Sequence, residues 1–237
     1  MSKPQTNNYY TNVYQKSFEV FAKRSKKLDP LLIALMVDPL EAEDAKREFG
    51  NKIPHSLEDF RSRDGQMAVD AALQTVAQWL VKQESIQMSI PEIAKWNSKL
   101  TVWMGIRQVD SFLSFAKTSD PRPREALRLA EEWVRGGDVA KKILRAAEDC
   151  YEAELSLRNS TGTEDSLEMD SFQSALAVCR SVLSFYGKDG YKVLWSAQHS
   201  TVAINTADID RYDSGAYEQR RARLKSRLAD AIMTFPA

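Results

Sequence analysis

The chain has 237 residues, with 33 lysines and arginines matched by 33 aspartates and glutamates and a hydrophobic fraction of 43%. This balance excludes a global field that would attract nucleic acid or an anionic membrane. The length allows one large domain or two small ones. The longest apolar run, residues 31–37, is far shorter than the roughly 20 residues that span a bilayer, and the polar start of the chain lacks a signal-peptide core. We therefore expect a cytoplasmic protein with no membrane partner.

Helical periodicity dominates the chain. Apolar residues recur at helical spacing and predict helices over 10–21, 30–37, 39–49, 69–80, 90–116, 121–134, 139–157, 172–186, 190–204 and 217–232. Gly105 would kink the long pattern over 90–116 or split it in two. Residues 50–63, which contain His55, and residues 158–165 are expected to be loops. Because no stretch shows convincing strand alternation, the sequence predicts an all-α fold, an irregular bundle of about eight to ten helices.

The stretch 119–137, SDPRPREALRLAEEWVRGG, concentrates several rare residue choices. Asp120 can cap a helix that carries Pro123 in its first turn, and Gly136 can supply a left-handed stop. Arg122 and Arg124 would lie at the positive end of the helix dipole, so they need acidic partners. We expect Asp120, Arg122 and Arg124 to form a buried or half-buried polar lock.

The sequence offers little catalytic chemistry. It contains no phosphate-binding loop, no dinucleotide fingerprint and no nucleophile elbow. With His55 and His199 as its two histidines, it cannot form a multi-histidine metal site. Cys150 and Cys179 fall on apolar helical faces and are expected to be reduced core residues. We therefore expect no enzymatic activity, no cofactor and no metal.

Three charged clusters leave alternatives open. The first cluster is acidic and consists of Glu148, Asp149 and Glu152. It predicts an exposed acidic face or the partners of the two motif arginines. An enzyme that uses His199 with Glu148 or Glu152 is the least favoured interpretation. A second acidic cluster, Asp208, Asp210 and Asp213, is expected to form a helix cap and a turn. The basic residues Arg220, Arg223 and Arg227 share one helical face and are the candidate phosphate contacts. A solvated face is the favoured interpretation, so nucleic acid is not the expected partner.

The motif resembles that of the Imm5-like immunity protein family, small all-α bacterial proteins. The matching positions are Asp120, Arg122, Pro123, Arg124, Ala126, Trp133 and Gly136, with Ala197 and His199 downstream. The resemblance covers roughly residues 100–234 and suggests two regions, 1–118 and 119–237, or one continuous domain.

The resemblance implies a non-enzymatic protein that binds and neutralises a toxin. Arg122, Arg124, Trp133 and His199 are then the candidate binding residues, and Asp120, Pro123 and Gly136 the structural part of the motif. We also expect His199 to be hydrogen-bonded in the core and to hold the motif helix. The alternative function, suggested by the first hundred residues, is a helical subunit or regulator in a bacterium–phage conflict complex, either a defence component or a phage inhibitor. The oligomeric state is left open.

Overall fold

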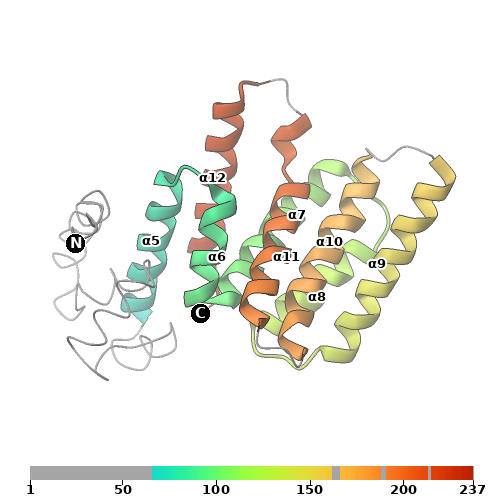
Figure 1. Ribbon diagram of the computed structural model, residues 1–237, viewed down its shortest axis with the longest axis horizontal. Coiled ribbons are helices and arrows are strands. Elements are labelled where there is room, and N and C mark those ends of the chain that lie inside the picture. Colours follow the sequence, from blue (N-terminus) through green and yellow to red (C-terminus); the bar gives the residue numbers. More distant parts are fainter. Residues whose placement is uncertain (1–65, 162–165, 188–190, 213–214, 237) are drawn as a thin grey trace, which may run out of the picture.

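A computed structural model describes residues 66–161, 166–187, 191–212 and 215–236 (Figure 1). These ranges hold eight α-helices, two short 3-10 helices and no strand. The all-α prediction is therefore confirmed for this part of the chain. The helices expected over 10–21, 30–37 and 39–49, together with His55, lie outside the described residues.

The α-helices are α5 (Gln66–Lys82), α6 (Ile86–Trp96), α7 (Ser98–Ala116), α8 (Arg122–Val134), α9 (Ala140–Thr161), α10 (Leu167–Leu183), α11 (Lys192–Thr206) and α12 (Tyr217–Met233). The 3-10 helices are η2 (Ser184–Tyr186) and η3 (Ile209–Tyr212). None of these helices is long and apolar enough to cross a bilayer.

Helix α10 lies at the centre of the main core. It packs between α9 and α11 and also contacts α7 and α8, while α5 lies at the opposite edge of the molecule from α9 (Figure 1). Phe112 of α7 and Phe172 of α10 are among the largest fully buried side chains of this core. Helix α7 precedes residue 118, and α8 to α11 follow it, so described helices on both sides of the suggested region boundary share one core.

The long apolar pattern over 90–116 divides at Asn97 and not at Gly105. Asn97 has an extended backbone, ends α6 and caps α7, where its Oδ1 accepts a hydrogen bond from the amide of Leu100 at 2.9 Å. An asparagine offers this local bond to the backbone in competition with a continuing helix. Gly105 remains inside α7, and a Cβ there would lie 3.7 Å from Val178 of α10 and from Ala203 of α11. The glycine thus marks a close crossing of three helices.

Helix α9 is longer than the apolar pattern predicts. Residues 158–161 continue the helix where we expected a loop. Arg158 donates a hydrogen bond to Glu154 Oε1 at 2.9 Å, one helical turn earlier. Such i,i+4 pairs support a last turn that has no apolar residue to bury.

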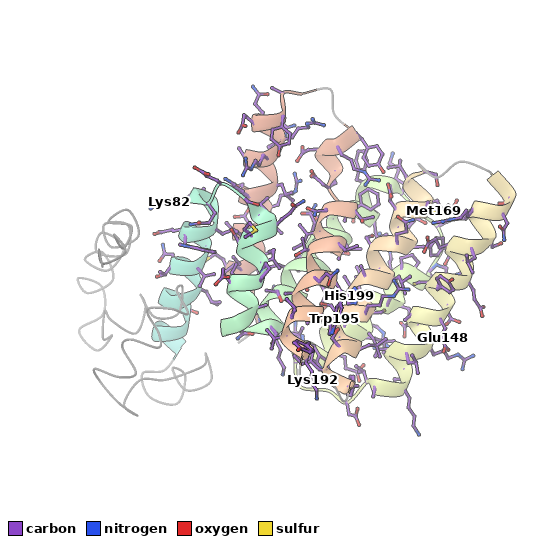
Figure 2. All side chains as sticks on the ribbon, viewed as in Figure 1. Lys82, Glu148, Met169, Lys192, Trp195 and His199 are labelled. Atoms are coloured by element: carbon purple, nitrogen blue, oxygen red, sulfur yellow. The ribbon has the colours of Figure 1, made fainter. Side chains whose placement is uncertain are left out.

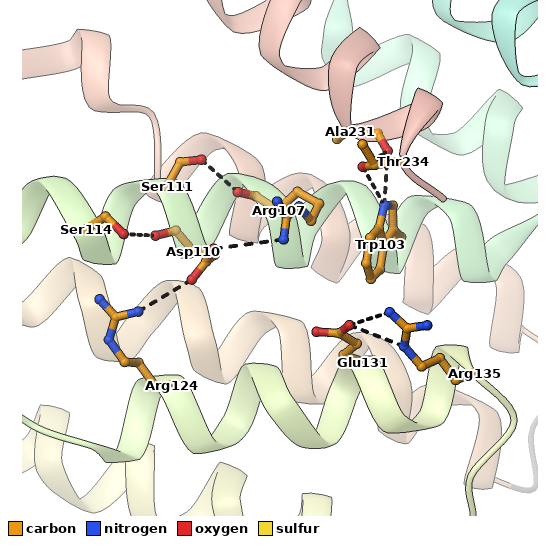
Figure 3. Close-up of polar contacts among 10 residues, drawn as sticks. All are labelled: Trp103, Arg107, Asp110, Ser111, Ser114, Arg124, Glu131, Arg135, Ala231 and Thr234. Atoms are coloured by element: carbon orange, nitrogen blue, oxygen red, sulfur yellow. Dashed lines mark hydrogen bonds and ion pairs between the residues drawn. The ribbon is translucent and has the colours of Figure 1, made fainter. Parts of the chain in front are cut away.

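Helix α12 links the α5 edge to the core because it packs against both α5 and α7. The indole Nε1 of Trp103 in α7 donates a hydrogen bond to the carbonyl of Ala231 at 3.0 Å (Figure 3). Leu224, Leu228 and Ile232 form the buried side of α12, as the sequence predicted, whereas Tyr217 is exposed.

Candidate functional site

The start of α8 is closed by a pair between Asp120 and Arg122. Asp120 Oδ1 accepts a hydrogen bond from the amide of Arg122 at 2.9 Å, and its Oδ2 lies 2.6 Å from Nη2 of the same residue. The bond from Arg122 holds the pKa of Asp120 below its usual range, and the pair raises the pKa of Arg122. The guanidinium also lies 5.1 Å from the ring centroid of Phe172. A cation at this helix start is therefore compensated locally and packed onto α10.

Arg124 has a different partner from Arg122. Its Nη1 lies 3.5 Å from Asp110 Oδ1 on α7, and Arg107 reaches the same carboxylate from the other side (Figure 3). Both side chains of the Arg124–Asp110 pair are more than two-fifths exposed. The motif arginines thus form two separate contacts in place of one polar lock. Their ion-pair partners are Asp120 and Asp110, while Asp149 of the cluster on α9 adds a weaker attraction that helps to raise the pKa of Arg122.

Trp133 and Gly136 secure the other end of α8. The Trp133 ring stacks on Phe185 of η2 at a centroid distance of 5.0 Å, with Lys99 Nζ 5.6 Å from the ring centroid. Gly136 has a φ of 94°, and its amide donates to the carbonyl of Trp133 at 2.9 Å. The left-handed stop predicted for Gly136 is confirmed. Because Trp133 is half-buried against the core, its replacement would disturb the fold as well as any binding surface.

His199 lies beside α10 and not beside the motif helix. It is half-buried in a shallow groove of about 430 Å³ whose walls also include Arg180, Leu183 and Trp195. Figure 2 shows Trp195 and His199 close together on α11. Burial, followed by the nearby charge of Arg180, lowers the pKa of His199, so the ring is neutral at neutral pH. The expectation that His199 braces the motif helix is not met by this placement.

Helix α11 reverses the usual placement of apolar and polar residues. Its buried side consists largely of small residues, with Ser196, Ala197 and Ser200 against α10. There, Ser181 of α10 bonds to the carbonyl of Ser196 and to the hydroxyl of Ser200, both at 2.7 Å. Small side chains joined by hydroxyl bonds let α10 and α11 approach closely, and Ile204 is the one large apolar side chain that α11 buries fully.

Several large apolar side chains of α11 are exposed, whereas Ile204 is buried. We call the outer face of α11 the stripe formed by Leu194, Trp195, Gln198 and Val202. Leu194, Trp195 and Val202 are 55%, 42% and 46% exposed. The helical spacing of apolar residues over 190–204 predicts Leu194 on the buried side with Ala197 and Ile204. The structure buries Ala197 and Ile204 but exposes Leu194. Exposed apolar side chains gathered on one helical face form a candidate interaction surface.

The basic residues of α12 have unequal roles. Arg223 Nε lies 2.6 Å from Asp210 Oδ1, and Arg227 reaches Asp208 Oδ1 at 2.9 Å and Asp210 Oδ2 at 2.7 Å. Asp208 and Asp210 therefore form ion pairs with arginines of α12 and also belong to the turn that precedes this helix. Two of the three candidate phosphate contacts are engaged within the fold, and Arg220 is the remaining one.

The two cysteines are buried free thiols. Burial raises the pKa of Cys150 to about 12 and also raises that of Cys179. Both are thus protonated at neutral pH, which matches the core role expected from the sequence. Among the described residues, no group of three or more His, Cys, Asp and Glu side chains could hold a metal ion.

The outer face of α11 is the feature that the sequence interpretation missed. A signal was present, because Leu194, Trp195 and Val202 recur at helical spacing opposite Ser196 and Ser200. The sequence of α11 alone does not decide whether its serine side or its apolar side faces the bundle. The choice depends on α10, because Ser181 of that helix supplies the bonding partner of the serine side.

Searches against protein-family models, curated proteins and solved structures found no match. The resemblance of residues 100–234 to immunity proteins therefore stays a prediction that rests on the motif alone.

Proposed function

We propose that the protein is a protein-binding module without enzymatic activity, and that the outer face of α11 contacts its partner. One observation carries the proposal: α11 keeps serines and alanines inside and exposes Leu194, Trp195 and Val202. Exposing such side chains to water costs free energy that burial against a partner would recover. Tryptophan is also among the residues that most often dominate binding energy at interfaces.

The groove beside this face suggests the chemistry of the partner. Arg180 contributes an exposed cation, and the neutral His199 ring and the Trp195 indole contribute flat surfaces. A partner that places an apolar side chain in the groove and a carboxylate against Arg180 would match both features. We therefore expect a folded protein whose binding surface has an apolar centre and an acidic rim.

The motif resemblance narrows the class of partner. A member of an immunity family would bind a toxin and block its action, and Arg122, Arg124 and Trp133 would act mainly by fixing α8 in the bundle that presents α11. The alternative is a subunit or regulator of a bacterium–phage conflict complex, which would use the same face to join an assembly.

The test compares two leucines with similar exposure on different helices. Leu194 on α11 is 55% exposed, and Leu144 on α9 is 49% exposed. A partner captured from the native host by the wild-type chain would be identified, purified and titrated against Leu194→Asp and Leu144→Asp. Because a carboxylate buried in an apolar contact is costly, we expect Leu194→Asp to weaken binding by at least about tenfold, and Leu144→Asp to leave it unchanged.

Circular dichroism of both variants would verify that the fold is retained. Equal binding by Leu194→Asp and the wild type would refute the assignment of the surface. Toxicity of the partner in cells, relieved by co-production of the wild type and not of Leu194→Asp, supports the immunity role. A stable multi-subunit complex with a non-toxic partner supports the alternative.

A further inference from the structure

We propose that a pocket between the start of α6 and the first turns of α12 binds the phosphate group of a small phosphomonoester. The pocket has a volume of about 330 Å³ and lies at the C-terminal end of α11, where Asn205 lines it and no residue of the outer face does. Six of its lining residues carry the argument: Ser85, Gln87, Asn205, Tyr217, Arg220 and Arg221. Its volume lies at the lower end of the range for small-molecule sites and exceeds what inorganic phosphate alone would fill.

Two arginines give the pocket its positive charge. Arg211 and Asp208 also line the pocket, but Arg211 is paired with Asp170, and Asp208 is paired with Arg227. Within the described part of the chain, no ion pair joins Arg220 or Arg221 to a carboxylate. Arg220 lies close enough to Asp208 to favour the charged form of that carboxyl, but neither guanidinium has a carboxylate as a direct partner, so both can pair with an anion from outside the protein.

Arg220 has an unmet hydrogen-bonding requirement. Its Nε is shielded from solvent and has no hydrogen-bond partner, although a buried donor without an acceptor is costly. A change of the Arg220 side-chain rotamer would bring Nε and one Nη toward an oxyanion in the pocket. Two parallel bonds of this kind are the geometry in which guanidinium recognises phosphate.

The start of α6 supplies a second, independent attraction for an anion. Ser85 caps this helix of 11 residues by accepting the amide of Met88 at 3.3 Å. The amides of Ile86 and Gln87 precede the first intrahelical bonds and, with the helix dipole, favour negative charge at this end. Because Ser85, Ile86 and Gln87 line the pocket, these amides and the arginines of α12 surround the same space.

Tyr217 favours a ligand larger than free phosphate. Its side chain is 65% exposed at the edge of the pocket, where its ring could cover an organic ring attached to the phosphate. Asn205 adds an amide that can both donate and accept hydrogen bonds. The arrangement fits a phosphomonoester with a flat ring better than one without.

The experiment is calorimetric titration of the full chain with adenosine 5′-monophosphate, glycerol 3-phosphate and inorganic phosphate at low ionic strength. We expect all three to bind, with adenosine 5′-monophosphate the tightest. Arg220→Met and Arg221→Met should each weaken binding by about tenfold, the loss typical of one charge-assisted contact. Arg145→Met, which removes the same charge from an exposed position on α9, should change binding by less than about twofold.

Several results would overturn the proposal. The first is that the wild type binds none of the three probes at millimolar concentrations. The second is that Arg145→Met and Arg221→Met change the binding affinity equally. An unphosphorylated single-stranded oligonucleotide that competes through Arg220 would assign the arginines to a nucleic-acid surface instead. Failure of Arg220→Met to fold would leave Arg221→Met as the deciding variant. Leu194→Asp should bind the probes normally, so this site and the proposed partner surface fail or succeed separately.

Discussion

Gly105 occupies a position where its lack of a side chain is not required. A Cβ there would make ordinary contacts of 3.7 Å with Val178 and Ala203, and the backbone is helical. Glycine lowers helix stability by about 0.5–1 kcal/mol relative to alanine. We therefore expect Gly105→Ala to raise the free energy of unfolding by about that amount, measured by urea denaturation. Gly105→Leu should lower it, since the longer side chain would enter the helix crossing.

Gly136 provides the opposite case. Its φ of 94° is a conformation that alanine adopts only with strain, and we expect Gly136→Ala to lower the free energy of unfolding by about 1 kcal/mol. A stabilising effect in the same urea assay would show that the end of α8 does not depend on this left-handed residue. The sequence identified Gly136 correctly, because a left-handed helix end is a local property.

Residue partners across the bundle were not predictable in the same way. The sequence showed that Arg124 needs a carboxylate but could not select Asp110, which lies 14 positions earlier on a different helix. Asp208 and Asp210 presented the same difficulty, since a turn with two aspartates gives no indication that α12 will bring Arg223 and Arg227 to them. Such contacts depend on how helices pack, and that information is distributed over many core residues.

At the scale of elements, Asp210 determines how α12 is attached to η3. Burial pushes the pKa of Asp210 upward, but hydrogen bonds from Arg223 and Arg227 outweigh it and hold the pKa below its ordinary value. A carboxyl of this kind stabilises the fold above the unfolded-state pKa of about 3.9, and that contribution is lost as pH falls through the lower folded-state pKa. Burial raises the pKa of Asp208, so ionisation of this carboxyl lowers the stability of the fold as the pH rises.

We therefore expect Asp210→Asn to lower the free energy of unfolding by about 2 kcal/mol at neutral pH. The gap between variant and wild type should narrow as the pH falls below about 4. Urea denaturation of both chains across this pH range measures the difference in their free energies of unfolding. Asp230→Asn, on the exposed side of the same helix, should show little difference at any pH; an equal loss in both variants would mean that the Arg223 and Arg227 pairs contribute nothing specific.

The elements themselves were largely predictable. Helix boundaries followed local signals where a clear one existed, as at the left-handed Gly136 just beyond the end of α8. The division at Asn97 was missed because Gly105 appeared to be the better helix breaker. In the folded protein, close packing around Gly105 stabilises a helix that glycine alone would weaken.

At the scale of the whole molecule, α12 links the α5 edge to the core around α10. Leu228 of α12 and Phe172 of α10 are both fully buried, and α7 contacts both helices. We expect the described region to unfold in a single transition, and Leu228→Ala and Phe172→Ala each to lower its stability by about 3 kcal/mol. Coincident curves from tryptophan fluorescence and circular dichroism would verify this. Two transitions, with Leu228→Ala shifting only one of them, would instead indicate separate domains.

The hydroxyl contact between α10 and α11 also has an evolutionary consequence. Ser181, Ser196 and Ser200 are fully buried where they meet, so we expect positions 196 and 200 of α11 to be restricted to serine, alanine and glycine. The opposite side carries no such steric restriction and is free to diverge as a binding partner diverges. Among homologous chains, we therefore expect the buried positions of α11 at this contact to vary little and its outer face to vary much more.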